Sequence, residues 1–413
     1  MAIYSLYLSV LFASAVGAQP ASLNTLPLGQ VTALAENGNV AAETYLGKLY
    51  ALGGGLVPGR NEVLNDNTAA LLWLNKAAAA GGAEAQTMLG QYYLSYYGPV
   101  QRNPETARLW LDKAAQQNYA PALTELGRMY KQADGVTGDS VKALSYYHRA
   151  GELGDAQAEY ELSLFYGNGQ GGVETDAVAA YRWTEKAARQ HQLQAENDLG
   201  YDYMWGRGTA ADAKKAVFWL TEAASAGEPR AQYDLGEIYA AGNAVPKDKT
   251  KARYWLEKSA IARNPRAMSQ LGNMDLYDKD YASALQWYQK AANAGSADGQ
   301  HNMTVMYAGG FGVTQDWAQA FSWAQKAARQ GFAESQIDLA WFYHNGRSVT
   351  PDMKMSYAWA LLAQAGGDAR ADELLAKLHD EMTPEDVAAA TNTADALAAT
   401  ITPEKDWSNP NNW

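Results

Sequence analysis

Tryptophan recurs along this chain at a nearly constant interval, and this periodicity constrains the fold more than any other feature of the sequence. One aromatic position repeats every 36 or 37 residues, with a single interval of 32. A period of this length is typical of solenoids, in which each unit is one supersecondary motif that buries its apolar face against its neighbours. The periodic aromatics are Trp73, Trp110, Tyr146, Trp183, Trp219, Trp255, Trp287, Trp323 and Trp359.

A second series, the ladder residues, precedes the periodic aromatics. Six of its nine members are followed by Gly, and eight have Tyr four residues later on the same helical face. A small residue after the Leu lets a neighbouring helix approach closely. The sequence therefore predicts nine units over 40–366, each with a Leu-Gly-x-x-Tyr helix followed by an Ala-x-x-Trp-x-x-Lys-Ala-Ala helix. The ladder residues are Leu46, Leu89, Leu126, Leu162, Leu199, Leu235, Leu271, Met303 and Leu339.

An Asp or Asn stands seven residues before every periodic aromatic, where each second helix should begin. Its side chain can accept hydrogen bonds from the backbone N–H groups of the first turn, which stabilises a helix by about 1 kcal/mol. Gly-rich links join the two helices, and they lack the form of a phosphate-binding loop. The predicted caps are Asp66, Asn103, Asp139, Asp176, Asp212, Asp248, Asp280, Asp316 and Asp352.

These patterns resemble the Sel1-like repeats, relatives of tetratricopeptide repeats with a longer link between the helices. Residues 158–188 match A-x-x-x-L-G-x-x-Y-x-x-G-x-G-V-x-x-D-x-x-x-A-x-x-W-x-x-K-A-A almost throughout. The resemblance implies an all-α fold, a right-handed α/α solenoid of about nine helical-hairpin repeats with helical caps. It also implies binding of proteins or peptides, and many members act in bacterial cell-envelope signalling, assembly or host contact. The unit of Leu271 departs from the pattern by its shorter link.

Composition and motifs exclude several classes of function. The absence of Cys rules out disulfides, thiolate metal sites and Cys nucleophiles. Some members of the family that these repeats resemble are disulfide-rich and β-lactamase-like, and the absence of Cys excludes that branch. A net charge of −12 disfavours non-specific binding to nucleic acid or to anionic membranes, and a charged partner would be either cationic or bound through a local patch. No hydrolase or zinc-protease motif occurs, and the five His share no ligand spacing. We therefore expect no catalysis, no metal and no cofactor.

The two ends of the chain differ from the repeats. Residues 1–18 lack charged side chains and contain an apolar run that ends in small residues, which predicts a signal peptide cleaved after Ala18. The mature protein would then be periplasmic or secreted and would have no membrane segment. The alternative is that these residues form a hydrophobic cap helix. We expect an N-terminal capping helix within 19–39, C-terminal capping helices within 367–399 and a flexible tail over 400–413. Trp407 and Trp413 of the tail either form a docking peptide or belong to a frayed end.

A solenoid of this kind lines its concave groove with its first helices, so positions around each ladder residue are the candidate binding site. Trp205 and Trp341 are notable because neither is a periodic aromatic, as is also true of Trp317. Such residues either form a binding hot spot or fill space between helices. The candidates are Tyr160, Leu164, Gln194, Asn197, Tyr201, Met204, Trp205, Arg230, Tyr233, Glu237, Asp298, His301, Glu334, Ile337, Trp341 and His344.

The sequence thus predicts an exported, non-enzymatic and monomeric scaffold or adaptor that holds a peptide or protein partner in its groove. Two alternatives stay open: an immunity or inhibitor protein against a secreted effector, and a cell-wall or glycan-modifying enzyme.

Overall fold

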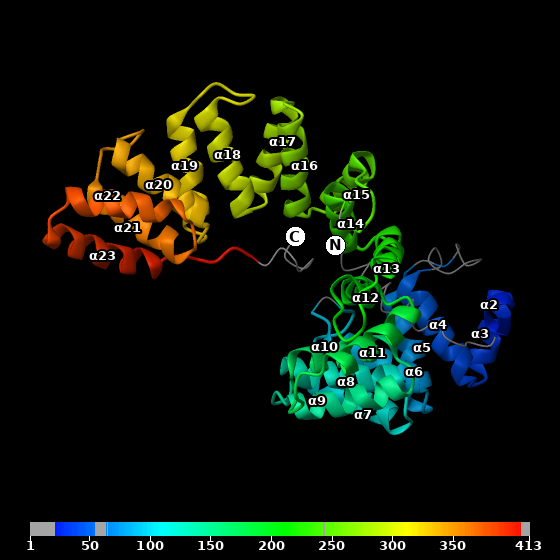
Figure 1. Cartoon of the computed structure of the whole chain (residues 1–413). Helices are drawn as coiled ribbons and strands as arrows, with labels where there is room; N and C mark the ends of the chain where they lie inside the picture. Colours follow the sequence, from blue (N-terminus) through cyan, green and yellow to red (C-terminus); the bar gives the residue numbers. More distant parts are fainter. Residues whose placement is uncertain (1–20, 54–62, 64, 97, 243, 406–413) are drawn as a thin grey trace. The chain divides into compact units, whose positions relative to one another are not determined.

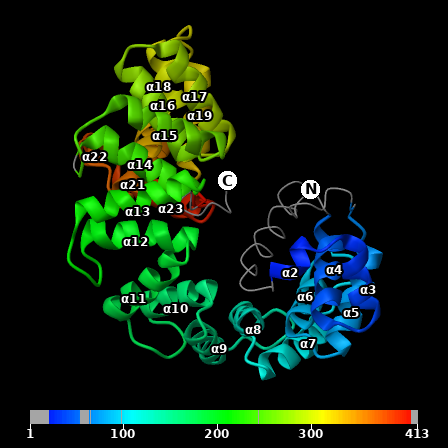
Figure 2. The same cartoon turned by 90° about the vertical axis from the view of Figure 1, so that its right-hand side faces the viewer.

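The structure is a computed structural model of the chain, and it describes residues 21–53, 63, 65–96, 98–242 and 244–405. Every regular element in these segments is an α-helix. The chain forms two compact units, unit 1 (Met1–Ala211) and unit 2 (Asp212–Trp413). Within each unit, consecutive helices pack side by side as pairs (Figures 1 and 2). The predicted all-α fold of repeated helical hairpins is confirmed.

Each repeat contributes a first and a second helix, and the fifth repeat places one in each unit. The first helices are α4 (Val40–Leu52), α6 (Ala83–Leu94), α8 (Ala120–Gln132), α10 (Ala156–Asn168), α12 (Leu193–Trp205), α14 (Pro229–Ala241), α16 (Pro265–Tyr277), α18 (Ala297–Gly309) and α20 (Ala333–Asn345). The second helices are α5 (Asn67–Ala79), α7 (Pro104–Gln116), α9 (Ser140–Glu152), α11 (Ala177–Arg189), α13 (Ala213–Ser225), α15 (Lys249–Ile261), α17 (Tyr281–Asn293), α19 (Trp317–Ala328) and α21 (Met353–Ala365).

The Asp or Asn before each second helix is its N-cap in all nine repeats, as predicted. In every case the side chain accepts a hydrogen bond from a backbone N–H of the first turn. Asp316, for example, accepts from Ala318 N at 2.9 Å and from Gln319 N at 3.0 Å. These caps fix where each second helix begins and therefore how its faces are oriented.

The Gly after the ladder residue sets the distance between the two helices of a repeat. A Cβ added at Gly236 would lie 2.6 Å from the side chain of Leu256 on the second helix, and one at Gly272 would lie 2.5 Å from Tyr288. Leu256 and Tyr288 directly follow a periodic aromatic and are buried. The residue after the aromatic, rather than the aromatic itself, thus fills the centre of each hairpin.

The periodic tryptophans are partly exposed in most repeats, although one packing position recurring in every repeat would be expected in the core. In five repeats the Lys three residues later places its ammonium over the indole ring, as Lys326 does at 3.7 Å from the ring centroid of Trp323. This geometry explains the Trp-x-x-Lys pattern as a cation–π pair on the helix surface. Only Trp73 and Trp359 are buried.

Neighbouring repeats are joined by hydrogen bonds of buried glutamines that the sequence did not single out. Gln86 donates its amide to the carbonyl of Ala78 at the end of the preceding second helix, and Gln232 and Gln336 repeat this bond with Ala224 and Ala328. Each of these carbonyls lies in the last turn of its helix, beyond the regular series of helical N–H donors, and accepts the Gln amide in addition to a backbone N–H three residues on. The bonds therefore satisfy helix termini and fix one repeat against the next.

Both ends of the repeat series carry further helices. At the front lie α2 (Ala21–Thr25) and α3 (Leu28–Glu36), and at the back lie α22 (Arg370–Glu381) and α23 (Pro384–Ala398). After α23 the chain runs back along unit 2: Thr402 N donates to the Arg329 carbonyl at 3.0 Å, and Glu404 accepts from Ala297 N at 2.6 Å. The flexible tail over 400–413 stays a prediction. Trp407, Trp413 and the predicted signal peptide lie outside the described residues.

We expect Gly236→Ala to destabilise the protein by about 1 to 3 kcal/mol, because the added methyl group overpacks against Leu256. Urea unfolding followed by circular dichroism measures the change. The matched control is Gly29→Ala, also within a helix, where an added Cβ meets no atom within 4 Å. Equal midpoints for the two variants would contradict the close-approach role of the ladder Gly.

Candidate functional site

The candidate groove residues of unit 1 lie on α10 and α12, and several of them bond to each other's helices. The Tyr160 hydroxyl donates to Asp198 at 3.0 Å, which ties α10 to α12. Asn197 is buried between helices, where its amide lies 3.4 Å from the same Asp198 side chain. The expectation that Asn197 projects into an open groove is therefore wrong. Sequence reasoning did not single out Asp198, because its polar partner lies in the preceding repeat.

The other candidates on α12 stay near the surface. Gln194 is exposed and accepts from Gln192 at 2.6 Å. Tyr201 is half-buried, with the Arg207 guanidinium 5.7 Å from its ring centroid. Trp205, the last residue of α12, is 71% exposed. Trp205 therefore does not fill space inside unit 1.

In unit 2, α14 and α16 pair in a similar way. Tyr233 is buried, and the Arg266 guanidinium lies 4.6 Å from its ring centroid. Glu237 accepts from Gln270 at 3.2 Å, and burial raises the pKa of its carboxyl. Arg230 is half-buried at the start of α14. Packing against the next first helix thus removes Tyr233 from the open surface, which corrects its placement in the groove. Ile337 on α20 is also buried, so its placement in the groove is wrong as well.

His301 on α18 lies beside a Ser and an Asp of α20, a combination that resembles part of a catalytic triad. Its Nδ1 atom is 3.1 Å from Ser335 Oγ and 3.3 Å from Asp338 Oδ2. A triad needs the Ser and the Asp on opposite ring nitrogens, and here both face the same one. Arg370 also reaches Asp338, at 3.5 Å. These side chains therefore connect α18, α20 and α22, and their geometry is not that of a catalytic triad.

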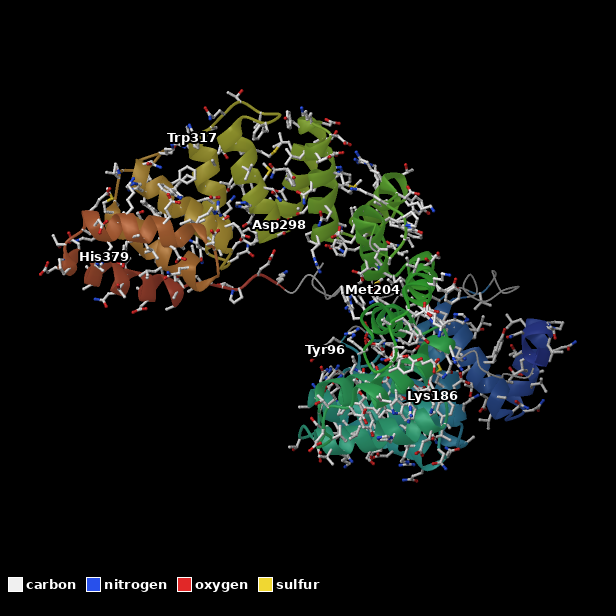
Figure 3. The ribbon with its side chains drawn as sticks, viewed as in Figure 1. Tyr96, Lys186, Met204, Asp298, Trp317 and His379 are labelled. Atoms are coloured by element: carbon white, nitrogen blue, oxygen red, sulfur yellow. The ribbon has the colours of Figure 1, made fainter. Side chains whose placement is uncertain are left out.

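Trp341 and Trp317, both outside the periodic series, line one cavity of about 380 Å³ in unit 2. We call it the Trp317–Trp341 pocket. Trp317 is the first residue of α19, directly after its cap (Figure 3), and Trp341 is on α20, where its ring packs edge-on against His344 at 5.5 Å. The other residues that line the pocket include Val305, Ala308, Phe311, Asp338, Phe342 and Arg347.

The Trp317–Trp341 pocket has aromatic walls and two charged groups at its edge. The Arg347 guanidinium lies 4.4 Å from the ring centroid of Trp317, and the Asp338 carboxylate faces His301 and Arg370. Val305 and Phe311 at the rim are each more than a third exposed. Sequence reasoning missed Val305, Phe311 and Arg347, because links and second turns of a repeat carry no pattern that reveals a shared cavity.

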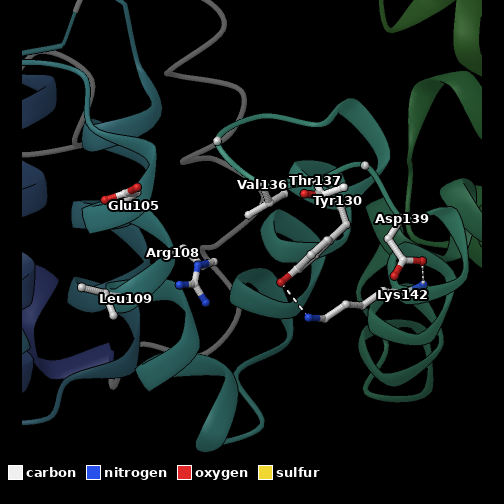
Figure 4. A pocket seen from close by; sticks show the side chains of 10 residues that line it. Glu105, Arg108, Leu109, Tyr130, Val136, Thr137, Asp139 and Lys142 are labelled. Carbon is white, nitrogen blue, oxygen red and sulfur yellow. Dashed lines mark hydrogen bonds between the residues drawn. The ribbon is translucent and has the colours of Figure 1, made fainter.

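Unit 1 has a larger and more polar cleft, of about 650 Å³, between α7, α9 and the link that precedes α9 (Figure 4). Lys142 donates to the Tyr130 hydroxyl at 2.7 Å, and this hydrogen bond raises the pKa of the Lys142 ammonium. Arg108, on the opposite wall, lies 3.4 Å from Asp112. Lys142 and Arg108, the two cations of the cleft, thus already have partners within the protein. The cleft is therefore a weaker candidate for a ligand site than the Trp317–Trp341 pocket.

The described residues contain no group of three or more His, Asp or Glu that could hold a metal ion. Among the same residues, no helix is both long and apolar enough to cross a membrane.

Comparison with known proteins identifies the repeat. A protein-family model of the Sel1 repeat matches nine segments that cover residues 40–368 almost without interruption. The chain belongs to the Sel1 repeat family. The matched segments are 40–82, 83–119, 120–155, 156–191, 193–228, 229–264, 265–296, 297–332 and 333–368.

Solved structures of Sel1 repeat proteins are similar to this chain. A Sel1 repeat protein from Oxalobacter formigenes is 30% identical, with a TM-score of 0.50 over 57% of this chain and 100% of its own. A protective antigen of uropathogenic Escherichia coli is 25% identical, with a TM-score of 0.44 over 91% of this chain and 95% of its own. An immunity protein from Pseudomonas aeruginosa is 21% identical, with a TM-score of 0.35 over 51% of this chain and 81% of its own. No curated protein matches the sequence.

Sel1 repeat proteins are typically non-catalytic scaffolds for protein interactions.

One buried carboxyl group on the first helices should make stability depend on pH. Glu228 is the N-cap of α14 and accepts from Ala231 N at 2.6 Å. Burial raises its pKa to about 7, an effect that the negative charge of Asp234 increases and the hydrogen bond from Ala231 opposes. The folded protein therefore keeps a proton at Glu228 that the unfolded chain loses near pH 4.5.

We expect the free energy of unfolding to fall as the pH rises from about 4.5 to 7, by up to about 3 kcal/mol from this group. Glu228→Gln keeps an oxygen for the Ala231 N–H and removes the charge, so this variant should lose that part of the pH dependence and be the more stable protein at pH 8. Urea unfolding at pH 5, 6, 7 and 8 measures the difference. Glu257→Gln, at an exposed position, is the control; the same pH profile in both variants would contradict the assignment to Glu228.

Proposed function

We propose that this protein is an exported, non-enzymatic scaffold that binds a peptide or protein segment along the first helices of unit 2. The observation that carries the proposal is the Trp317–Trp341 pocket, which brings together two Trp that the repeat pattern does not require. A large aromatic side chain beside a cavity is the usual composition of a binding hot spot. Polar pairs such as Gln270 with Glu237 hold the neighbouring first helices in place, so the surface is largely formed before a partner arrives.

Export is the second part of the proposal. It is supported by the uncharged, apolar residues 1–18 with small residues before the expected cleavage site. The compartment is then the periplasm or the outside of the cell, where a Cys-free chain needs no disulfide chemistry. An inhibitory or immunity role is one form of the same binding function, and it would give the same pocket a secreted effector as its partner.

Trp341→Ala is expected to weaken partner binding at least tenfold, because it removes one aromatic wall of the pocket. The partner is first captured from envelope extract on the wild-type protein and identified by mass spectrometry, and the purified partner is then titrated against each variant. Phe218→Ala, at an exposed position of the second helix α13, is the matched control and should bind within about twofold of wild type. Unchanged affinity of the Trp341 variant would overturn the proposal.

Folding and turnover are measured alongside. Trp341 is half-buried, so Phe311→Ala, which removes a more exposed pocket wall, is the second variant if Trp341→Ala lowers the melting temperature by more than about 4 °C. The enzyme alternative is tested on peptidoglycan fragments: turnover by the purified protein would reject the non-enzymatic scaffold, whereas binding without turnover supports it.

A further inference from the structure

The two first helices that flank the Trp317–Trp341 pocket carry an unusual distribution of charge. Helix α18 contains Asp298, helix α20 contains Glu334 and Asp338, and neither helix contains a Lys or an Arg. Two cations near them are Arg370, which pairs with Asp368 and Asp338, and Arg347, which stacks on Trp317. Glu404, from the segment after α23, adds a carboxylate at Ala297 N, next to Asp298. Carboxylates therefore predominate on this surface, in a chain whose overall charge is −12.

These carboxylates lie on the same helical faces as the rim of the pocket. Asp298 precedes the pocket residue Val305 by seven positions on α18, and Glu334 precedes Trp341 by seven positions on α20. Seven residues are about two turns, so both carboxylates lie on the pocket face of their helix, about 10 Å towards its N-terminal end. Asp298 is labelled on α18 in Figure 3. The surface thus has an apolar end and an anionic end at a fixed separation.

We propose that this surface binds a peptide segment in which a large apolar side chain and a Lys or Arg stand three positions apart. The apolar side chain enters the Trp317–Trp341 pocket, and the cation lies between Asp298 and Glu334. In a polyproline II segment, residues three apart point to the same side and are about 9 Å apart, which matches the distance between the two ends of the surface. Either chain direction fits, because the match depends only on this spacing.

The negative charge of this surface favours a cationic peptide over an acidic or neutral one. Asp298 on α18 and Glu334 on α20 attract a cation and repel an acidic side chain, and each unfavourable juxtaposition lowers affinity. The pocket itself is lined mainly by Val305, Ala308, Phe311 and the two Trp, which favour an apolar side chain. This inference rests on the proposed peptide-binding function and adds the chemistry of the partner.

The test uses the full chain and short fluorescent peptides in anisotropy titrations. The probes are end-blocked Gly-Trp-Pro-Pro-Lys-Gly and its reverse order, Gly-Lys-Pro-Pro-Trp-Gly. We expect at least one of them to bind with a Kd of about 1 mM or tighter, the range of a weak but specific contact. Replacing Trp by Ala in that probe, or Lys by Glu, should weaken binding at least tenfold.

Matched protein variants locate the binding. Val305→Lys places a cation at the rim of the pocket, where the side chain is 36% exposed, and should weaken the Trp-Lys probe at least tenfold. Val178→Lys, on α11 in unit 1 at a position that is 47% exposed, should leave binding unchanged. Asp298→Asn combined with Glu334→Gln should reduce the preference for the Lys probe over the Glu probe. Glu174→Gln combined with Glu257→Gln, at exposed positions elsewhere, is the control for net charge.

The outcomes separate this inference from the function on which it rests. Equal affinity for the Lys and Glu probes, or equal affinity of wild type and Val305→Lys, overturns the inference while peptide binding stands. If no probe binds but the captured partner still depends on Trp341, the partner chemistry is wrong and the scaffold function stands. If neither the probes nor the partner depend on the pocket, both proposals are wrong.

Discussion

The close contact between a ladder Gly and the residue that follows the periodic aromatic is the constraint on which the rest of the structure depends. At Gly236 and Gly272 even one additional carbon atom would collide with the facing helix. This contact fixes the distance between the two helices of a hairpin, and the N-cap of the second helix fixes where that helix begins. Once both are set in each repeat, the first helices present the same positions to their neighbours throughout a unit.

The side chains at those positions mostly serve the repeats themselves. Tyr160 bonds to Asp198, Glu237 to Gln270, and His301 approaches Asp338, each across adjacent first helices. Polar groups that are paired in this way gain little by changing partners, since a new contact must first replace an existing one. These side chains thus mainly hold the repeats together, and the Trp317–Trp341 pocket differs from them in being lined largely by apolar and aromatic groups.

Sequence periodicity predicted most of the fold because its signals are local. The caps from Asp66 to Asp352 depend on hydrogen bonds within three residues, and the ladder Gly depends on contacts within one repeat. The candidate site was predicted less well. Helical spacing placed Trp341 among the groove candidates, and in the structure it lines the pocket. The same spacing could not show that Asn197 and Tyr233 are buried, because the residues that cover them come from other repeats.

By itself, the sequence determined the helical hairpin, its nine copies, the first residue of each second helix and the family to which the chain belongs. These properties follow from a period and from short-range capping and packing that each repeat contains in full. Only the tertiary structure decided that most periodic Trp stay partly exposed, that Thr402 and Glu404 bond to Arg329 and Ala297, and that Trp317 and Trp341 share one cavity. Each of these depends on a distance between segments that no spacing along the chain specifies.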